Sequence, residues 1–519
     1  MAASVAFLWH MHQPYYRNPV GGEYRMPWTF LHAAKDYYDM LRLAVDGDAR
    51  VTFNLVPSLM DQLEDYAREG VADTFLDPLR VHPSDLGVEA REDLLPRLLF
   101  AHLGNQISPL PRYAELHDKV RALGAAAARG LSLQDLLDLE VLFLLAWTGE
   151  VVRAEEPQVR SLLAKGREFS QADKAVLLGV LHRLAGRTLD AYREAQDTGA
   201  IEISTTPYYH PILPLLLDME SARMALPQVT LPVIQRGFGE DAARHVRDAV
   251  TRYRGAFGRP PLGFWPSEGS VSAAALGLLA DEGVDWAASD EDVLAASLGI
   301  SLSGVARAEL YRPHVFRSAG GAEIAVFFRD KTLADLVGFT YATWDTELAV
   351  RDFAGRLGEL ARGSARGGTI SVILDGENAW EFYRENGAPF LRALYREIAA
   401  HPDLHFRTFS ECRDGGRLLP RVHAGSWIYG SFSTWIGHPE KNRAWELLER
   451  TRCRLEDEEG RLGTEQRELA WREIRIAEGS DWFWWLGDDH YTPLAGEFDQ
   501  LFRLHLLNVY QIAGLEPPA

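Results

Sequence analysis

The sequence predicts an α/β protein, an incomplete (β/α)7 barrel with a helical insertion and a helical C-terminal region. Three observations predict this fold class. Short apolar segments recur along the first three quarters of the chain, helical periodicity fills most intervals between them, and polar residues follow most of them directly. Alternating strands and helices are typical of a parallel sheet, and polar residues at successive strand ends are typical of a barrel. An open, doubly wound sheet would bring fewer strand ends to one site.

Seven segments are predicted to be buried parallel strands, because each is apolar, rich in β-branched or aromatic residues, and followed by polar turn residues. They are Val5–Trp9, Val51–Val56, Ile201–Thr205, Gly263–Trp265, Trp286–Ser289, Ile324–Phe328 and Ile370–Leu374. Helical periodicity is clear in Ser272–Glu282 and Leu348–Ala361, which each precede one of these strands. With seven strands, the barrel is incomplete relative to the eight-stranded type.

Two regions outside the alternating pattern are predicted to be helical. Residues 57–199 are rich in Leu, Ala, Arg and Glu with helical spacing, as in Leu133–Leu145 and Ala172–Tyr192, and we expect them to cover the barrel rim. After about residue 386 we expect no further strands. Helices are predicted there at Phe390–Ala400, Glu440–Arg454, Thr464–Ile476 and Phe498–Tyr510. We therefore divide the chain into a barrel domain, 1–385, and a C-terminal helical region, 386–519, that contributes to the site.

Composition excludes several classes of partner. The net charge of −20 over 519 residues disfavours binding to nucleic acid, but it is compatible with a neutral polymer such as a polysaccharide. Cys412 and Cys453 are the only cysteines, too few for a disulfide framework or a cysteine zinc site. Residues 1–10 lack the basic segment of a secretory signal, and no 18-residue apolar run predicts a membrane span. We expect a cytoplasmic protein, and nothing in the sequence indicates its oligomeric state.

Two carboxylates lie at the ends of short apolar strands, each close to an aromatic residue. Glu268 follows Trp265, and Asp375 precedes Trp380. Sugar chemistry needs such a pair, with one carboxylate at the anomeric carbon and one acid at the leaving oxygen, and aromatic faces stack on pyranose rings. Each acid also has a structural explanation. Glu268 would lie at the N-terminus of the next predicted helix, where acids are favoured. Asp375-Gly376 is typical of a plain turn.

His10 and His12 follow the first strand at i and i+2, so their side chains point to the same side. A metal site would need a third ligand and usually a carboxylate partner. We favour histidines that line a cleft and bind sugar hydroxyls, and we expect no metal and no cofactor. The rival interpretation is a metal-dependent, deacetylase-like barrel that uses both histidines and an acid.

Further polar and aromatic residues are candidates for substrate binding. Glu202 alternates with Ile201 and Ile203, which aims it into the barrel interior or a cleft, although a structural ion pair alone explains a buried acid better. The other candidates follow predicted strands or lie in aromatic, acid-containing segments near the C-terminus. They are His210, Trp265, Asp330, Trp435, Asp481 and Trp482.

Five blocks, taken in order, resemble the motif regions of glycoside hydrolase family 57. They are His12-Gln13-Pro14, residues 199–210, Trp265-Pro266-Ser267-Glu268, Asp375-Gly376-Glu377-Asn378 and residues 478–485. The resemblance covers nearly the whole chain and is strongest to α-amylases and amylopullulanases. It implies a (β/α)7 barrel and a retaining mechanism on α-glucans, with Glu268 as nucleophile and Asp375 as general acid/base. It also places His12, Glu202 and Trp265 near the −1 sugar.

The sequence therefore predicts a retaining glycoside hydrolase that acts on α-1,4-glucans of the amylase or amylopullulanase type, through a covalent glycosyl-enzyme intermediate. A 4-α-glucanotransferase or a glucan branching enzyme is the alternative within the same chemistry. A different class, a non-catalytic carbohydrate-binding protein on a decayed barrel, would be expected to lose one carboxylate, and both are present.

Overall fold

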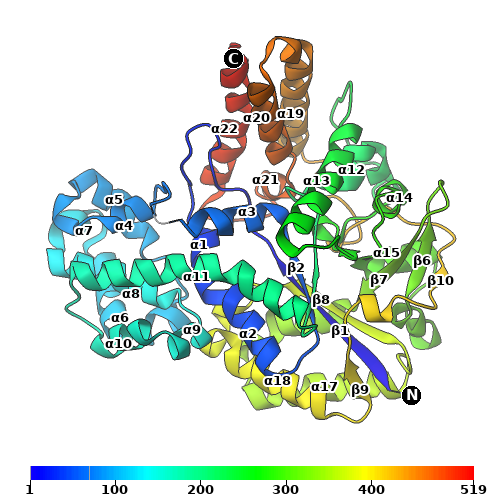
Figure 1. Ribbon diagram of the computed structural model, residues 1–519, viewed down its shortest axis with the longest axis horizontal. Coiled ribbons are helices and arrows are strands. Elements are labelled where there is room, and N and C mark those ends of the chain that lie inside the picture. The colour runs from blue at the N-terminus through cyan, green and yellow to red at the C-terminus, as the bar shows by residue number, and fades with distance from the viewer. Residues whose placement is uncertain (1, 69, 519) are drawn as a thin grey trace.

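The computed structural model of the protein describes residues 2–68 and 70–518. Its strands form two five-stranded, largely parallel sheets surrounded by helices (Figure 1). The first sheet has the order β3-β2-β1-β8, with β9 beside the first residues of β1, and the second has the order β10-β6-β7-β5-β4. The strands are β1 (Ala3–Met11), β2 (Thr52–Leu55), β3 (Glu202–Ser204), β4 (Gly263–Phe264), β5 (Trp286–Asp290), β6 (His314–Arg317), β7 (Glu323–Arg329), β8 (Thr369–Asp375), β9 (Leu404–Phe406) and β10 (Arg417–Leu418).

All seven predicted strands are confirmed, but the prediction that strands stop near residue 386 is wrong. β9 pairs with β1 and β10 pairs with β6, so two strands come from the C-terminal region. β6, which forms the antiparallel pair with β7, was also not predicted. These three strands have two to four residues each, too few to show a strand period in the sequence.

Two backbone contacts join the two sheets. Thr205, just after β3, forms an isolated parallel bridge with Phe264 of β4, and the N–H of Asp330, just after β7, donates to the carbonyl of Ser371 in β8 at 3.0 Å. Alternate side chains of strands from both sheets pack into one separate apolar cluster. Its members include Ala6, Leu8, Trp286, Ala288, Ala325, Phe327 and Ile373. Because strand side chains alternate, these inward residues give the two sheets a common interior.

Between β2 and β3 the chain forms helices, as predicted for this insertion. They are α3 (Pro57–Tyr66), α4 (Leu76–Arg80), α5 (Val88–Arg97), α6 (Pro111–Leu123), α7 (Ala127–Gly130), α8 (Leu133–Ala146), α9 (Glu150–Glu155), α10 (Pro157–Lys165) and α11 (Gln171–Asp197). Ser132 and Ser170 begin α8 and α11 with capping boxes, in which the serine hydroxyl and the N3 aspartate satisfy backbone N–H groups reciprocally. Figure 1 shows α4 to α10 gathered beside the long helix α11, on one side of the sheets.

The remaining helices cover the sheets or form the C-terminal region. They are α1 (Trp28–His32), α2 (Tyr38–Asp46), α12 (Leu213–Leu217), α13 (Gly239–Phe257), α14 (Ala273–Asp281), α15 (Glu291–Leu298), α16 (Lys331–Asp335), α17 (Thr346–Arg362), α18 (Ala388–Ala400), α19 (Pro439–Glu458), α20 (Thr464–Ala477), α21 (Ser480–Trp484) and α22 (Ala495–Ala513). In Figure 1, α19, α20 and α22 stand together at the top of the molecule. No helix in the described parts of the chain is long and apolar enough to cross a membrane.

The register of the first sheet places polar residues together at its carboxyl edge. His10 in β1 lies opposite Asn54 in β2 on one side and opposite Asp375 in β8 on the other. Gly376 keeps the end of β8 against β1, since a Cβ atom there would lie 2.1 Å from Sδ of Met11. The strand pairing itself therefore brings a histidine and a carboxylate side by side.

Candidate active site

Glu268 lies in a strained turn directly after β4. It occupies a short 3-10 turn, Ser267–Gly269, with φ of 58° and ψ of 24°, the left-handed region that residues other than glycine rarely adopt. Gly269 follows with φ of 59°, and a Cβ atom at this position would lie 2.7 Å from the Trp265 ring. Strained backbone of this kind persists only where the surroundings enforce it, and it concentrates at functional sites. The turn aims the Glu268 carboxyl group into the molecule, where the residue is only 9% exposed.

Two donors from the C-terminal region hold the Glu268 carboxylate. The indole N–H of Trp427 donates to Oε2 at 2.9 Å, and the hydroxyl of Ser480 donates to Oε1 at 3.2 Å. Burial raises the pKa of Glu268 to about 8; the charges of Asp375 and Asp481 add to the rise, and both hydrogen bonds oppose it. Burial and the neighbouring acids thus favour the protonated form of Glu268, and the two hydrogen bonds favour the carboxylate.

Asp375 is the last residue of β8 and remains partly exposed at the carboxyl edge of the sheet. The amide of Asn378 donates to its Oδ2 at 2.9 Å. Burial raises the pKa of Asp375, while the Asn378 hydrogen bond and the charges of His12 and Arg329 act in the opposite direction. A carboxyl group with a raised pKa can carry the proton that a general acid donates.

A chain of hydrogen bonds runs from β2 through two histidines to the Glu268 turn. Nδ1 of His10 donates to Oδ1 of Asn54 at 2.7 Å, and Nε2 of His10 lies 3.1 Å from Nε2 of His210. Nδ1 of His210 lies 2.9 Å from Oγ of Ser480, which also reaches Glu268. His210, like Glu268, has a left-handed backbone conformation, with φ of 59°. Burial lowers the pKa of His10 to about 3 and the pKa of His210 well below its ordinary value.

These low pKa values fix the hydrogen positions in the chain. The amide N–H groups of Asn54 donate to Ser204 and Thr205, so its Oδ1 accepts and Nδ1 of His10 carries hydrogen. Neutral His10 therefore accepts at Nε2 from His210, whose Nδ1 is then an acceptor for Ser480. The single Ser480 proton has two acceptors within reach, His210 and Glu268. Of the two donors to Glu268, Ser480 therefore also belongs to the histidine chain, whereas Trp427 does not.

His12 and Asp481 meet across the same site. Nε2 of His12 donates to Oδ1 of Asp481 at 2.8 Å, and the backbone N–H of His12 donates to Oε1 of Glu377 at 3.0 Å. The rings of His12 and His210 stack with centroids 3.9 Å apart. Within the described residues, His12, His210 and Asp481 each offer a ligand atom within 4.8 Å of the others, so they are the group that could hold a metal ion.

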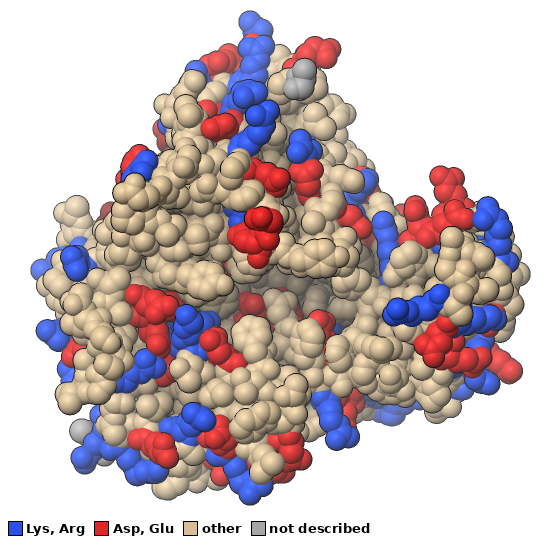
Figure 2. Space-filling model, turned by 180° about the vertical axis from the view of Figure 1, so that it is seen from behind, with Lys and Arg blue, Asp and Glu red and all other residues tan. Residues whose placement is uncertain are grey.

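One cavity of about 450 Å³ joins these groups. Six of the predicted site residues line it, namely His10, His12, His210, Glu268, Asp375 and Asp481. The wall also contains many aromatic side chains: Tyr16, Trp28, Phe100, Trp147, Trp427, Trp484, Trp485 and Phe498. Figure 2 shows one face of the molecule hollowed at its centre, with acidic side chains in the hollow and along its rim. Carboxyl groups at the centre of an aromatic wall suit an uncharged ligand with hydroxyl groups and flat faces.

The other predicted acids lie outside the lining and have structural partners. Glu202 is held at Oε1 by the indole N–H of Trp286 at 2.9 Å and by the hydroxyl of Ser410 at 2.5 Å. Asp330 caps α16 by accepting from the N–H of Leu333, and its other oxygen binds Arg307 and Tyr311. Both acids thus stabilise the fold around the cavity in this arrangement.

The predicted tryptophans also lie behind the wall. Trp265, Trp435 and Trp482 are at most 2% exposed. Trp265 packs edge-on against Trp427, with ring centroids 5.1 Å apart, and Trp435 packs against Trp484 at 6.0 Å. The rings that reach the cavity are therefore Trp427, Trp484 and their neighbours, and the predicted ones support them.

Sequence reasoning missed several residues of the site. Trp427, Ser480 and Glu377 contact the key groups but were not among the candidates. Ser480 directly precedes Asp481, and Glu377 lies two positions after Asp375, so proximity along the chain was a usable signal for both. Trp427 lies 159 positions from Glu268, in a loop without a recognisable motif.

Comparison with solved structures places the fold among known proteins. A branching enzyme from Pyrococcus horikoshii aligns with 99% of this chain and 88% of its own, at 16% identity and a TM-score of 0.58. An α-amylase from Thermotoga maritima aligns with 98% and 93%, at 16% identity and a TM-score of 0.59. A 4-α-glucanotransferase from Thermococcus litoralis aligns with 100% and 61%, at 14% identity and a TM-score of 0.55.

No curated protein matches the sequence. The family model of glycosyl hydrolase family 57 matches residues 6–423, which contain eight of the eleven candidate site residues, Glu268 and Asp375 among them; Trp435, Asp481 and Trp482 lie beyond the match. This match spans most of the chain and confirms the resemblance seen in the sequence motifs. The chain therefore belongs to glycosyl hydrolase family 57.

Proposed function

We propose that the protein is a retaining glycosidase that acts on α-1,4-linked glucans, with Glu268 as nucleophile and Asp375 as general acid/base. The observation that carries the proposal is the common cavity of these two carboxyl groups, which come from the ends of β4 and β8. The names of three similar solved structures, a branching enzyme, an α-amylase and a 4-α-glucanotransferase, support an α-glucan as substrate.

In the proposed reaction, the Glu268 carboxylate attacks the anomeric carbon while Asp375 protonates the glycosidic oxygen. Asp375 then removes a proton from an incoming water or sugar hydroxyl, which releases the sugar from Glu268. Burial raises the pKa of both carboxyl groups. The proposed reaction requires the form that carries one proton, on Asp375, with Glu268 as a carboxylate. The hydrogen bond from Trp427 favours this form because it stabilises Glu268 as a carboxylate.

The fold supports this assignment. We propose that the seven parallel strands close into a (β/α)7 barrel through the Thr205–Phe264 bridge and the Asp330–Ser371 hydrogen bond. We further propose that residues 1–385 form the catalytic domain, and that the C-terminal region, 386–519, completes the site. The contacts of Trp427 and Ser480 with Glu268 support a shared site.

Hydrolysis of the amylase or amylopullulanase type is the activity we favour, and transfer to a sugar hydroxyl, by a glucanotransferase or branching enzyme, is the alternative. The two differ in what attacks the glycosyl-enzyme. Five tryptophans line the cavity and can stack on a glucan chain: Trp28, Trp147, Trp427, Trp484 and Trp485.

Incubation with maltoheptaose followed by chain-length analysis tests the proposal. Shorter products alone mean hydrolysis, and a ladder of shorter and longer chains means transfer. Anomeric NMR of the first products gives the stereochemistry, which should be retained in either case. An unchanged substrate, with amylose and pullulan also unchanged, would contradict an α-1,4-glucan specificity.

A further inference from the structure

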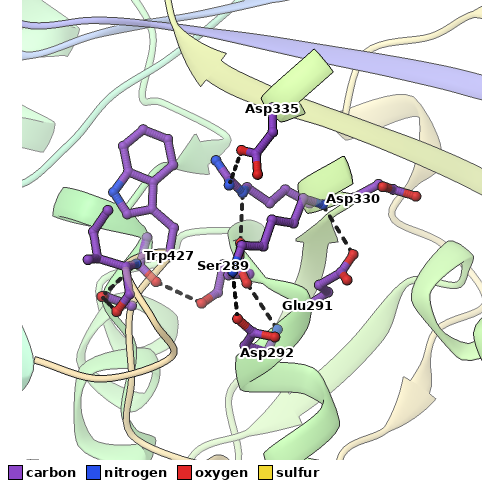
Figure 3. Close-up of polar contacts among 12 residues, drawn as sticks. Ser289, Glu291, Asp292, Asp330, Asp335 and Trp427 are labelled. Atoms are coloured by element: carbon purple, nitrogen blue, oxygen red, sulfur yellow. Dashed lines mark hydrogen bonds and ion pairs between the residues drawn. The ribbon is translucent and has the colours of Figure 1, made fainter. Parts of the chain in front are cut away.

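Arg329 is a nearly buried cation beside the cavity wall. It is the last residue of β7 and is 7% exposed. Its Nε donates to Oδ2 of Asp290 at 2.7 Å, and a second guanidinium nitrogen lies 3.4 Å from Oδ1 of Asp335. Figure 3 shows Asp335 at the top of this network and Trp427 at its left, with Asp292 below. Two carboxylates therefore fix the plane of the Arg329 guanidinium, since arginine offers its donors in a rigid fork.

The guanidinium of Arg329 lies over the ring of Trp427. The guanidinium carbon lies 5.0 Å from the centroid of the Trp427 ring, within the range of a cation–π contact. Trp427 in turn holds Glu268 at two points. Its backbone N–H donates to the Glu268 carbonyl at 3.0 Å, and its indole N–H donates to the Glu268 carboxylate at 2.9 Å. A cation on an indole face withdraws electron density from the ring, which makes the indole N–H a stronger donor.

We propose that Arg329 is a positioning residue of the catalytic pair, which clamps Trp427 in the plane that serves Glu268 and sets a fixed positive charge beside Asp375. This inference rests on the proposed roles of Glu268 and Asp375. It adds a residue that touches neither the substrate nor the reacting atoms and acts through Trp427 and through its charge.

The charge of Arg329 acts on a crowded group of acids. Four charged or titratable groups face Asp375. They are Glu268 in the turn after β4, Glu377 in the loop that follows Asp375 itself, His12 at the end of β1 and Arg329 in β7. The positive charge of Arg329 lowers the pKa of Asp375, against the rise that burial causes. Without Arg329, the pKa of Asp375 should rise because a nearby positive charge is lost. The pKa of Glu268 should also rise, because its hydrogen bond from Trp427 weakens.

A second arginine of the same network supplies a matched control. Arg307 forms two hydrogen bonds with Glu291 and one with Asp330, at 2.9–3.0 Å. Its guanidinium lies 5.9 Å from the Tyr311 ring, not on Trp427. Arg307→Met therefore removes a half-buried cation from the same cluster but leaves the contact with Trp427 and Glu268 in place.

The first test is the pH profile of kcat/KM on maltoheptaose for Arg329→Met, Arg329→Lys and Arg307→Met. We expect Arg329→Met to lower kcat roughly tenfold with a smaller change in KM, and to move both limbs of the profile to higher pH. Arg329→Lys, which keeps the charge, should restore the basic limb more than the acid limb. Equal profiles for Arg329→Met and Arg307→Met would overturn the inference.

The second test needs no activity. Incorporation of 5-fluorotryptophan gives a fluorine NMR resonance for Trp427, identified by its loss in Trp427→Phe. Its chemical shift should titrate with Glu268, and the midpoint should rise in Arg329→Met but not in Arg307→Met. An unchanged midpoint would contradict the role of Arg329. An unmodified enzyme without activity on any α-glucan would contradict the proposed function instead, and the fluorine titration would still decide the role of Arg329.

Discussion

The indole N–H of Trp427 donates to Oε2 of Glu268 at 2.9 Å, from a residue 159 positions further along the chain. This hydrogen bond joins the C-terminal region to the turn after β4. It is also the donor that Glu268 holds independently of the histidine chain, because the Ser480 proton is shared with His210. Trp427 therefore favours the carboxylate form of the proposed nucleophile, against the rise in its pKa that burial causes.

Replacing Trp427 by phenylalanine should move the acid limb of kcat/KM to higher pH. A hydrogen bond to the charged form lowers a pKa, so its loss should raise the pKa of Glu268 above the present value of about 8. Below the new pKa more of the enzyme is protonated and inactive. A hydrogen bond to a charged group is worth about 1.5–3 kcal/mol, so we expect roughly a tenfold or larger loss of kcat/KM near neutrality. Trp471→Phe, which removes an indole hydrogen bond to Glu459, is the control. An acid limb at the same pH in both variants would count against the assignment.

Replacing Glu268 by glutamine should abolish turnover and leave the fold intact. The amide has nearly the same shape but is a poor nucleophile, and it still accepts from Trp427 at its oxygen. We expect a loss of roughly three orders of magnitude or more in kcat, with an unfolding temperature close to that of the unmodified protein. Circular dichroism and thermal unfolding control for the fold. Retention of more than about a tenth of the activity would remove Glu268 from its role.

Replacing Asp375 by alanine should affect substrates according to their leaving group. A general acid matters for a sugar alkoxide, which must be protonated, and matters little for a nitrophenolate. Activity on maltoheptaose should fall far more than the glycosylation step on a nitrophenyl maltoside. Added azide, which needs no general base, should then accelerate turnover and give a glycosyl azide of retained configuration. An equal loss on both substrates, without azide rescue, would contradict the general acid/base role.

Chelation of metal ions should leave the initial rate nearly unchanged. The proposed mechanism supplies its nucleophile and its acid from carboxyl groups, so no step requires a Lewis acid. Although His12, His210 and Asp481 are close enough to bind an ion, Nε2 of His12 and Oδ1 of Asp481 already share a hydrogen bond. Rates should be compared before and after exhaustive treatment with EDTA. Activity that disappears and returns with zinc would favour the metal-dependent, deacetylase-like interpretation.

The strands and the two central carboxyl groups were predictable because they depend on local pattern. Glu268 and Asp375 each follow a short apolar run, and parallel strands bring such ends to one edge. The same pattern places Asp330 directly after β7 and Glu202 within β3. It cannot reveal that Trp286 and Arg307 already bind their oxygens, because those partners come from distant segments.

The rest of the site depends on contacts that a sequence pattern does not encode. β9 and β10 are too short to show a period, and their place is set by pairing with β1 and β6. Trp427 and Trp435 lie eight positions apart in the same aromatic segment of the sequence. Trp427 lines the cavity, whereas Trp435 is buried behind its wall. Composition favours aromatic stacking in general, but only the packing of the whole fold decides which rings reach a ligand.

Trapping of the covalent intermediate tests the central claim most directly. The enzyme should be incubated with a fluorinated α-glucosyl or α-maltosyl fluoride, whose glycosyl-enzyme hydrolyses slowly, and then digested and sequenced by mass spectrometry. The account predicts one sugar ester, on the peptide that contains Glu268, with none in Glu268→Gln. An ester on Asp375, Glu377 or Asp481, or first products of inverted configuration without any ester, would contradict it.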